Sequence, residues 1–181
     1  MRIRRTAALG LIVCALATVL AGVAYGALSQ ETQLEQACGA TADSVDKVLA
    51  HASSAQPATV QSQLVLVTPG TLSGRIAFNR YGKRVTVSAD AASSTTSGFS
   101  CSQGRAGRHG LGPGRSRVVS TLTRSFAKPG TYTLTFRLNQ VGRTLLGQLA
   151  AAQKAYDKQH PHGHARPSLA FGVALTYAAN G

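Results

Sequence analysis

Large apolar residues alternate with polar or small ones in two stretches of the chain, and this alternation constrains the fold more than any other feature. It runs through residues 131–138 (TYTLTFRL) and residues 168–178 (SLAFGVALTYA). Because successive side chains of an extended strand point to opposite faces, a period of two is typical of strands that bury one face. We therefore expect an antiparallel sheet in which four residues are buried together: Leu134, Phe136, Phe171 and Leu175.

Shorter alternating runs extend this pattern to other parts of the chain. Strands are expected at residues 63–68 and 117–126, and residues 73–90 predict a hairpin with its turn at Gly82. Residues 91–117 are rich in Ser, Gly and Arg, so we expect a long loop there. About six short strands with turn signals between them favour a β-sandwich.

Two other segments carry apolar residues at helical spacing. Residues 30–54 place them at every third or fourth position, and residues 139–158 combine such a stripe with high helix propensity. The first stripe consists of Leu34, Ala37, Cys38, Thr41, Val45, Val48, Leu49 and Ala52. The second consists of Val141, Leu145, Leu149, Ala152 and Tyr156. We expect one helix before the strands, joined to them by a linker at residues 53–59, and a second helix before the last strand.

Two motifs resemble a pattern in exported bacterial immunoglobulin-like (Ig-like) domains. Residues 128–149 (KPGTYTLTFRLNQVGRTLLGQL) are similar to a strand of the form PGTYTLxF that runs into a turn of the form GRxLL. Residues 71–87 (TLSGRIAFNRYGKRVTV) are similar to an early LSGR…GKxVTV hairpin, and the resemblance covers residues 60–178. It implies a mainly β fold, namely an Ig-like antiparallel β-sandwich with an N-terminal helix and one inserted helix before the last strand. It implies no catalytic residue, because such domains serve adhesion, binding or spacing.

The N-terminus carries the pattern of an export signal. Arginines precede an uncharged apolar segment at residues 6–28, and the small residues Ala24 and Gly26 fit cleavage after Gly26. The segment is long for a signal peptide, so an uncleaved signal-anchor is the alternative. With either outcome we expect the body of the protein to be secreted or to lie on the outer face of the cytoplasmic membrane, in the cell envelope. The expected domains are a signal peptide or signal-anchor (1–26), an N-terminal helical segment with its linker (27–59) and an Ig-like β-sandwich (60–181).

Beyond the signal the chain holds two cysteines, Cys38 and Cys101. Two cysteines in an oxidising compartment most simply form a disulfide. The alternative is a pair of free buried thiols. A disulfide would tie the first helix to the sandwich.

Positive charge is concentrated in the predicted sandwich. The whole chain has a formal net charge of +13, and residues 72–143 hold twelve Lys and Arg residues against one acid, Asp90. Within this region a Gly-rich stretch contributes Arg105, Arg108, Arg115 and Arg117. Such a field would concentrate an anionic envelope polymer or an acidic lipid surface. The alternative is a surface that only keeps the protein soluble, and we expect no nucleic acid partner, because of export and because no aromatic residues stand among these arginines.

Three histidines, His160, His162 and His164, fall within five residues after the second predicted helix. In an extended segment, alternate residues share a face, so three imidazoles could bind a divalent metal ion such as Zn²⁺ or Cu²⁺. Asp157, at the end of the preceding helix, or His51 or His109 from elsewhere in the chain, could complete the ligand set. The Pro and Gly residues between the histidines indicate a turn instead, and a solvated loop without metal is the alternative.

Motifs of catalysis are absent from the sequence. It contains no G-x-S-x-G nucleophile elbow, no G-x-x-x-x-G-K-[ST] phosphate loop and no H-E-x-x-H zinc motif. We therefore expect no enzymatic activity and no required cofactor. The sequence favours a non-catalytic exported binding or structural module of the envelope. The alternatives are an exported metal-binding protein that uses His160–His164 and a secreted enzyme of unrecognised type.

Overall fold

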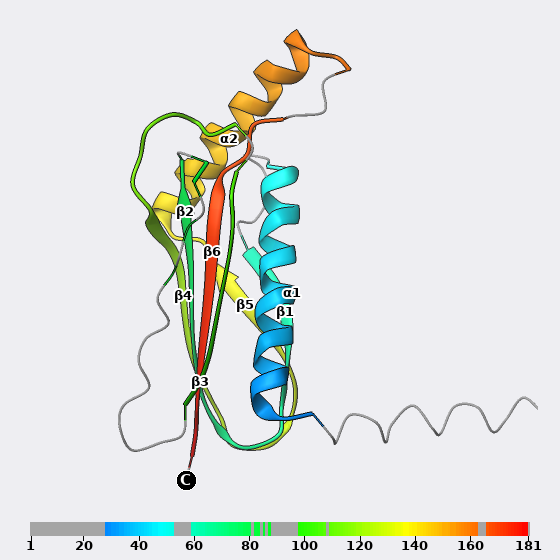
Figure 1. The fold of residues 1–181 in the computed structure, drawn as a ribbon, viewed down its shortest axis with the longest axis vertical. Helices are drawn as coiled ribbons and strands as arrows, with labels where there is room; N and C mark the ends of the chain where they lie inside the picture. The colour runs from blue at the N-terminus through cyan, green and yellow to red at the C-terminus, as the bar shows by residue number, and fades with distance from the viewer. Residues whose placement is uncertain are drawn as a thin grey trace, which may run out of the picture.

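The computed structural model describes residues 28–52, 59–80, 82, 83, 85, 87, 98–107, 109–162 and 166–180. Within these residues the fold is mainly β, with antiparallel sheets and two helices (Figure 1). The elements in chain order are α1 (Gln30–Ala50), β1 (Thr59–Leu66), β2 (Gly70–Asn79), β3 (Gly98–Arg105), β4 (Arg117–Phe126), β5 (Gly130–Arg137), α2 (Gln140–Gln159) and β6 (Ala170–Ala179). The predicted export segment and most of the predicted linker lie outside the described residues. None of the helices described is long and apolar enough to cross a membrane.

The strands form two antiparallel sheets. One contains β1 and β5, and the other has the order β3-β6-β2-β4. The chain passes between the sheets three times. It does so from β1 to β2 and from β4 to β5, each time through a Pro-Gly pair, and from β5 to β6 through α2. The two Pro-Gly crossings lie side by side, because Leu66 pairs with Gly130 and Gly70 pairs with Phe126. A Cβ at Gly70 would overlap the carbonyl oxygen of Ala178, so only glycine fits at this crossing.

Helix α1 packs against β1, β3 and β6 (Figure 1). It begins after Ser29, whose hydroxyl accepts a 3.2 Å hydrogen bond from the backbone N–H of Thr32 and so caps the first turn. The predicted stripe is confirmed, with Val48 and Ala52 packed at the edge of the core. Its buried members are Leu34, Ala37, Cys38, Thr41, Val45 and Leu49. The helix and both sheets therefore share one hydrophobic core.

Strand β6 is buried on both of its faces. Its large side chains lie in the main core, and the prediction that Leu134, Phe136, Phe171 and Leu175 are buried together is confirmed. Its second face carries small residues because another segment lies directly on it. The second apolar cluster formed there consists of Ala77, Val85, Val87, Ala170 and Ala174.

Two local predictions are wrong. Strand β2 has β4 and β6 as its neighbours, so Val85 and Val87 cannot form the second arm of a hairpin with it. They cover the outer face of the larger sheet instead, where the Ser102 hydroxyl donates a 2.7 Å hydrogen bond to the carbonyl oxygen of Val87. The predicted loop at 91–117 contains strand β3, which pairs with β6 along its whole length. Pairing and the neighbouring helix stabilise β3 despite its Ser- and Gly-rich sequence.

Helix α2 follows β5 after two residues, and its span is close to the predicted one. Asn139 caps it, because the side-chain oxygen accepts a 3.0 Å hydrogen bond from the N–H of Gly142. The far end of α2 extends past the ends of the strands in Figure 1. Its buried residues are Gly142, Leu145, Leu146, Leu149 and Gln153. Val141, expected in the buried stripe, is 42% exposed.

Candidate anion-binding site

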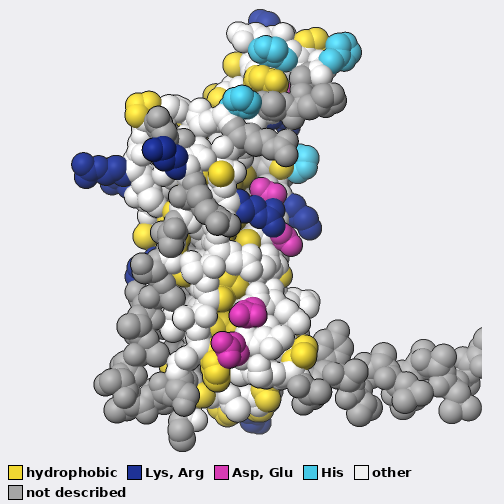
Figure 2. Space-filling model, in the orientation of Figure 1, with side chains coloured by type: hydrophobic (Ala, Val, Ile, Leu, Met, Phe, Trp, Pro, Cys, Tyr) yellow, Lys and Arg dark blue, Asp and Glu magenta, His cyan; other side chains and the backbone are white. Residues whose placement is uncertain are grey.

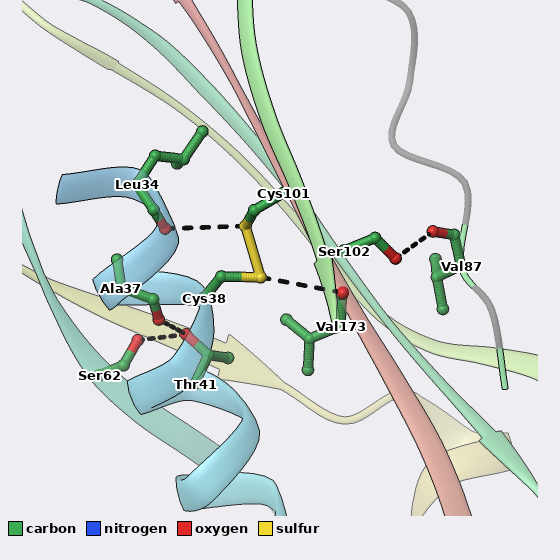
Figure 3. The surroundings of a disulfide bond; sticks show 9 residues. All are labelled: Leu34, Ala37, Cys38, Thr41, Ser62, Val87, Cys101, Ser102 and Val173. Atoms are coloured by element: carbon green, nitrogen blue, oxygen red, sulfur yellow. Dashed lines mark hydrogen bonds between the residues drawn. A yellow bond between two sulfur atoms is a disulfide. The ribbon is translucent and has the colours of Figure 1, made fainter. Parts of the chain in front are cut away.

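Helix α1 and strand β3 are joined by a pair of cysteines (Figure 3). Cys38 and Cys101 lie at disulfide distance, with their Cα atoms 6.4 Å apart, which confirms the predicted pairing. The same turn of α1 contacts β1, because the hydroxyl groups of Thr41 and Ser62 lie 2.7 Å apart. The helix is therefore held to both sheets by specific contacts as well as by its apolar face.

Arg105, one of the arginines predicted to bind anions, forms ion pairs with α1. Its Nη1 donates a 2.9 Å hydrogen bond to Asp46, and its Nη2 contacts Asp43. The two acids lie three positions apart on the helix and so share one face. The charge of Arg105 is compensated within the protein, and Arg105 connects β3 to α1 close to the disulfide.

Arg115 and Arg117, two further members of the predicted set, line a pocket of about 410 Å³ together with Arg80. Arg80 follows β2, and the other two belong to the segment that leads into β4. The opposite wall is one side of α2, where the lining residues are Gln140, Val141, Thr144, Leu145 and Gln148. Arg108 lies outside the described residues. We refer to this pocket, with its three arginines and its α2 wall, as the basic pocket.

Arg80 is the most constrained of the three arginines. Its Nη2 donates a 3.3 Å hydrogen bond to the carbonyl oxygen of Leu111, and its own carbonyl accepts a 2.9 Å bond from the Leu111 N–H. Its stem packs against Gly114, where an added Cβ would stand 3.1 Å from the Cβ of Arg80. The Nε of Arg80 is buried and has no hydrogen-bond partner among the described residues. An unsatisfied buried donor costs free energy in the folded state.

No acidic residue lines the basic pocket in the part of the chain that the structure describes. The described acids lie on α1 and near the end of α2, and acidic side chains are visible over α1 in Figure 2. The first turn of α2, which borders the pocket, carries no acid either. Its backbone N–H groups add a partial positive charge to that of the guanidinium groups. Among the described residues, the positive charge of the pocket is therefore not compensated by neighbouring side chains.

The described residues of the predicted metal site contact other groups of the protein. The ring of His160 stacks on Tyr156 with centroids 4.4 Å apart, and its Nδ1 lies 3.2 Å from the Tyr156 carbonyl oxygen. Asp157, a suggested fourth ligand, forms an ion pair with Arg166 at 2.6 Å. His162 is exposed and His164 lies outside the described residues. Among the side chains described, no group of three His, Cys, Asp or Glu could hold a metal ion.

The lining of the basic pocket is suited to binding rather than to proton transfer. Arginine stays protonated in proteins, and the amide and hydroxyl groups of Gln and Thr do not titrate near neutral pH. Guanidinium groups present planar sets of donors that match phosphate and carboxylate oxygens. Comparisons with protein-family models, with curated proteins and with solved structures find no match to this chain.

Proposed function

We propose that this chain is an exported, non-catalytic binding or structural module of the cell envelope, which holds an anionic envelope polymer or an acidic lipid surface through its basic pocket. The observation that carries the proposal is the convergence of Arg80, Arg115 and Arg117 on one pocket without an acidic side chain in its described lining. Two other arginines, Arg105 and Arg166, are neutralised by ion pairs with aspartates. The three pocket arginines are therefore the best-placed cations for an external anion.

The architecture supports a binding module. Two antiparallel sheets that enclose one core are compatible with an Ig-like β-sandwich, a fold whose rigid body carries binding loops. The basic pocket is formed where the ends of strands meet a loop and a helix, as is common for sites supported by a stable sheet. The fold alone does not define the ligand.

The cysteine pair that joins α1 to β3 supports export. Disulfides persist in oxidising compartments and are rare in the reducing cytosol. The Cys38–Cys101 pair fits the export segment that the sequence predicts at residues 1–26. Removing that segment takes away three arginines and no acids, so the remaining chain holds 16 Lys and Arg against 6 acids, a net charge of +10. A net charge of this sign favours encounter with polyanions outside the cell.

The proposal is tested by co-sedimentation of residues 27–181, in oxidised form, with purified cell-wall polymer and with vesicles that contain an anionic phospholipid. Replacing Arg115 and Arg117 by Gln should abolish most of the bound fraction at low salt. The matched control replaces Lys128 and Arg124 by Gln. Arg124 lies near the other end of β4, about 23 Å from Arg117 along the strand, and Lys128 follows in the turn to β5. Equal losses for both double variants would show that only net charge matters, and full binding by the pocket variant would refute the proposal.

A further inference from the structure

We infer that the basic pocket binds one phosphorylated sugar or polyol unit as a discrete ligand. This inference rests on the proposed function, because it names the chemical group that the pocket would recognise in an envelope polymer or a lipid headgroup. It goes further in requiring a saturable site for a small molecule. A diffuse positive surface would attract polyanions but would hold no such ligand.

The three arginines of the basic pocket favour a phosphate group as the anion that is bound. Three guanidinium groups reach one pocket from two separate segments, so their donors approach a ligand from different directions. A tetrahedral phosphate group offers acceptors in several directions, whereas the two oxygens of a carboxylate lie in one plane. A phosphate monoester carries a charge of about −1.5 to −2 near neutral pH. A phosphate that links two units of a polymer or a lipid headgroup is a diester with one negative charge, so for these sources the argument rests on the directions of its oxygens. Of the two anions, phosphate therefore satisfies more of the guanidinium donors that line the pocket.

A sugar or polyol is indicated by the α2 wall. Gln140, Thr144 and Gln148 are spaced four residues apart and so form a polar ridge along one side of the helix. Val141 and Leu145 form an apolar ridge beside it. Hydroxyl groups can exchange hydrogen bonds with the first ridge, while the C–H groups between them contact the second. A volume of about 410 Å³ also falls in the range of pockets for small organic ligands and exceeds what a phosphate group alone would fill.

The two walls are fixed relative to each other. The backbone N–H of Asn139 donates a 2.8 Å hydrogen bond to the carbonyl oxygen of Val119, and its side-chain amide donates a 3.1 Å bond to that of Val118. Gly142 lies so close to β4 that a Cβ there would stand 3.0 Å from the Val119 side chain. The start of α2 is thus attached to the strand that Arg117 begins. A site formed in advance loses little conformational entropy when a ligand binds.

Calorimetric titration of the oxidised 27–181 protein tests this inference, with glucose 1-phosphate, glycerol 3-phosphate, inorganic phosphate, glucose and glucuronate as ligands. The two phosphate esters should bind with one-to-one stoichiometry and about tenfold or more tightly than glucuronate, and glucose should not bind measurably. Arg115→Gln and Arg117→Gln should each weaken the esters about tenfold. Lys128→Gln should change their affinity by less than about twofold.

The α2 wall has its own test. Thr144→Val and Gln148→Ala should weaken glucose 1-phosphate several-fold and leave inorganic phosphate unchanged, since only the sugar reaches that ridge. Circular dichroism and thermal unfolding show whether each variant is folded, and because Arg115 and Arg117 are exposed we expect them to be. Equal affinity for glucuronate and glucose 1-phosphate, or esters unaffected by either arginine variant, would overturn the inference.

The outcomes separate this inference from the proposed function. If envelope polymer binds and depends on the pocket arginines but neither ester binds, the inference fails and the proposed function stands. If the esters bind but neither polymer nor anionic vesicles do, the proposed function fails and the inference stands. When both hold, competition by glycerol 3-phosphate against polymer and against phosphatidylglycerol vesicles identifies which source carries the recognised phosphate.

Discussion

Removing the Cys38–Cys101 disulfide should lower the free energy of unfolding by about 4 kcal/mol. The bond joins residues 63 positions apart in the sequence. In the chain-entropy model, closing a loop of this size removes about 14 cal/mol/K of entropy from the unfolded chain, which is about 4 kcal/mol at room temperature. The double substitution Cys38→Ala and Cys101→Ala, or reduction of the wild-type protein, returns this entropy to the unfolded state.

The folded state should survive the change, because α1 has a second means of attachment. Leu34, Val45 and Leu49 are each 0–1% exposed in the shared core. Full burial of such a side chain contributes about 1.5–3 kcal/mol, so the three together exceed the loss of the disulfide. We therefore expect α1 to stay docked and the reduced protein to unfold in one transition. Separate unfolding of α1 at low denaturant would show that the disulfide, rather than the apolar face, holds the helix.

Urea unfolding followed by far-ultraviolet circular dichroism measures the effect. The chain has no tryptophan, so tyrosine signals serve as the second probe. With a denaturant slope of about 2 kcal/mol/M, the midpoint should fall by about 2 M. The reduced wild-type protein controls for the lost sulfur atoms of the alanine variant. A shift below about 0.5 M in both samples, or two alkylatable thiols in the oxidised protein, would refute the reasoning.

Four further substitutions test the core, one buried hydroxyl and the ion pairs of Arg105 with α1. Phe136→Ala should cost about 3–5 kcal/mol in urea unfolding. Gly74→Ala should cost about 1–3 kcal/mol, because its new Cβ would stand 2.7 Å from the Phe136 ring. Burial raises the pKa of Tyr177, so the folded state favours the neutral phenol. Stability should therefore fall as pH rises above about 10, where the unfolded chain ionises first, and Tyr177→Phe should reduce this decline. Arg105→Gln should cost at most about 1 kcal/mol, because its ion pairs are exposed, and should leave anion binding intact.

For each of these predictions, one result would contradict it. A loss below about 1 kcal/mol for Phe136→Ala would show that β5 does not contribute to the core as described. Additive costs for Phe136→Ala and Gly74→Ala would show that the two positions do not compete for space. If the free energy of unfolding falls equally steeply above about pH 10 in the wild type and in Tyr177→Phe, the decline comes from other ionisable groups. A loss of polymer binding in Arg105→Gln as large as in Arg115→Gln would show that Arg105 also contributes to anion binding.

The parts of the fold that sequence could predict are those governed by short-range periodicity. The strand predicted at 117–126 coincides with β4, and the stripe of α1 was predicted residue by residue. Both depend on burial of one face, which leaves a period of two or of 3.6 in the sequence. The disulfide could be predicted because only two cysteines follow the export segment.

Elements that depend on tertiary neighbours were missed for a physical reason. Strand β3 has the composition of a loop and is extended because β6 and α1 border it. The small residues of β6 indicated a solvent-facing side, but Val85 and Val87 cover them. Small residues are required where another segment lies close to a sheet, and they are also tolerated where a sheet faces solvent. The alternation alone could therefore not distinguish a covered face from an exposed one.

The candidate site was predicted in part. Arg115 and Arg117 belong to the basic stretch that the sequence singled out, whereas Arg105 lies near the acids of α1 and is neutralised there. Arg80 was missed because it joins the pocket from a distant segment. The regular spacing of Gln140, Thr144 and Gln148 is visible in the sequence, but the exposure of Val141 beside them is not, because its helical spacing places it in the predicted buried stripe.

Salt dependence of polymer binding tests the central claim most directly. The oxidised 27–181 protein is titrated with purified anionic wall polymer at a series of salt concentrations from about 50 mM to about 1 M, with and without chelator. Binding through uncompensated arginines should weaken steeply along the series, because salt screens the charges and reduces the gain from counterion release, and chelator should have no effect. Equal affinity at both ends of the series, or no binding at about 50 mM, would contradict the account.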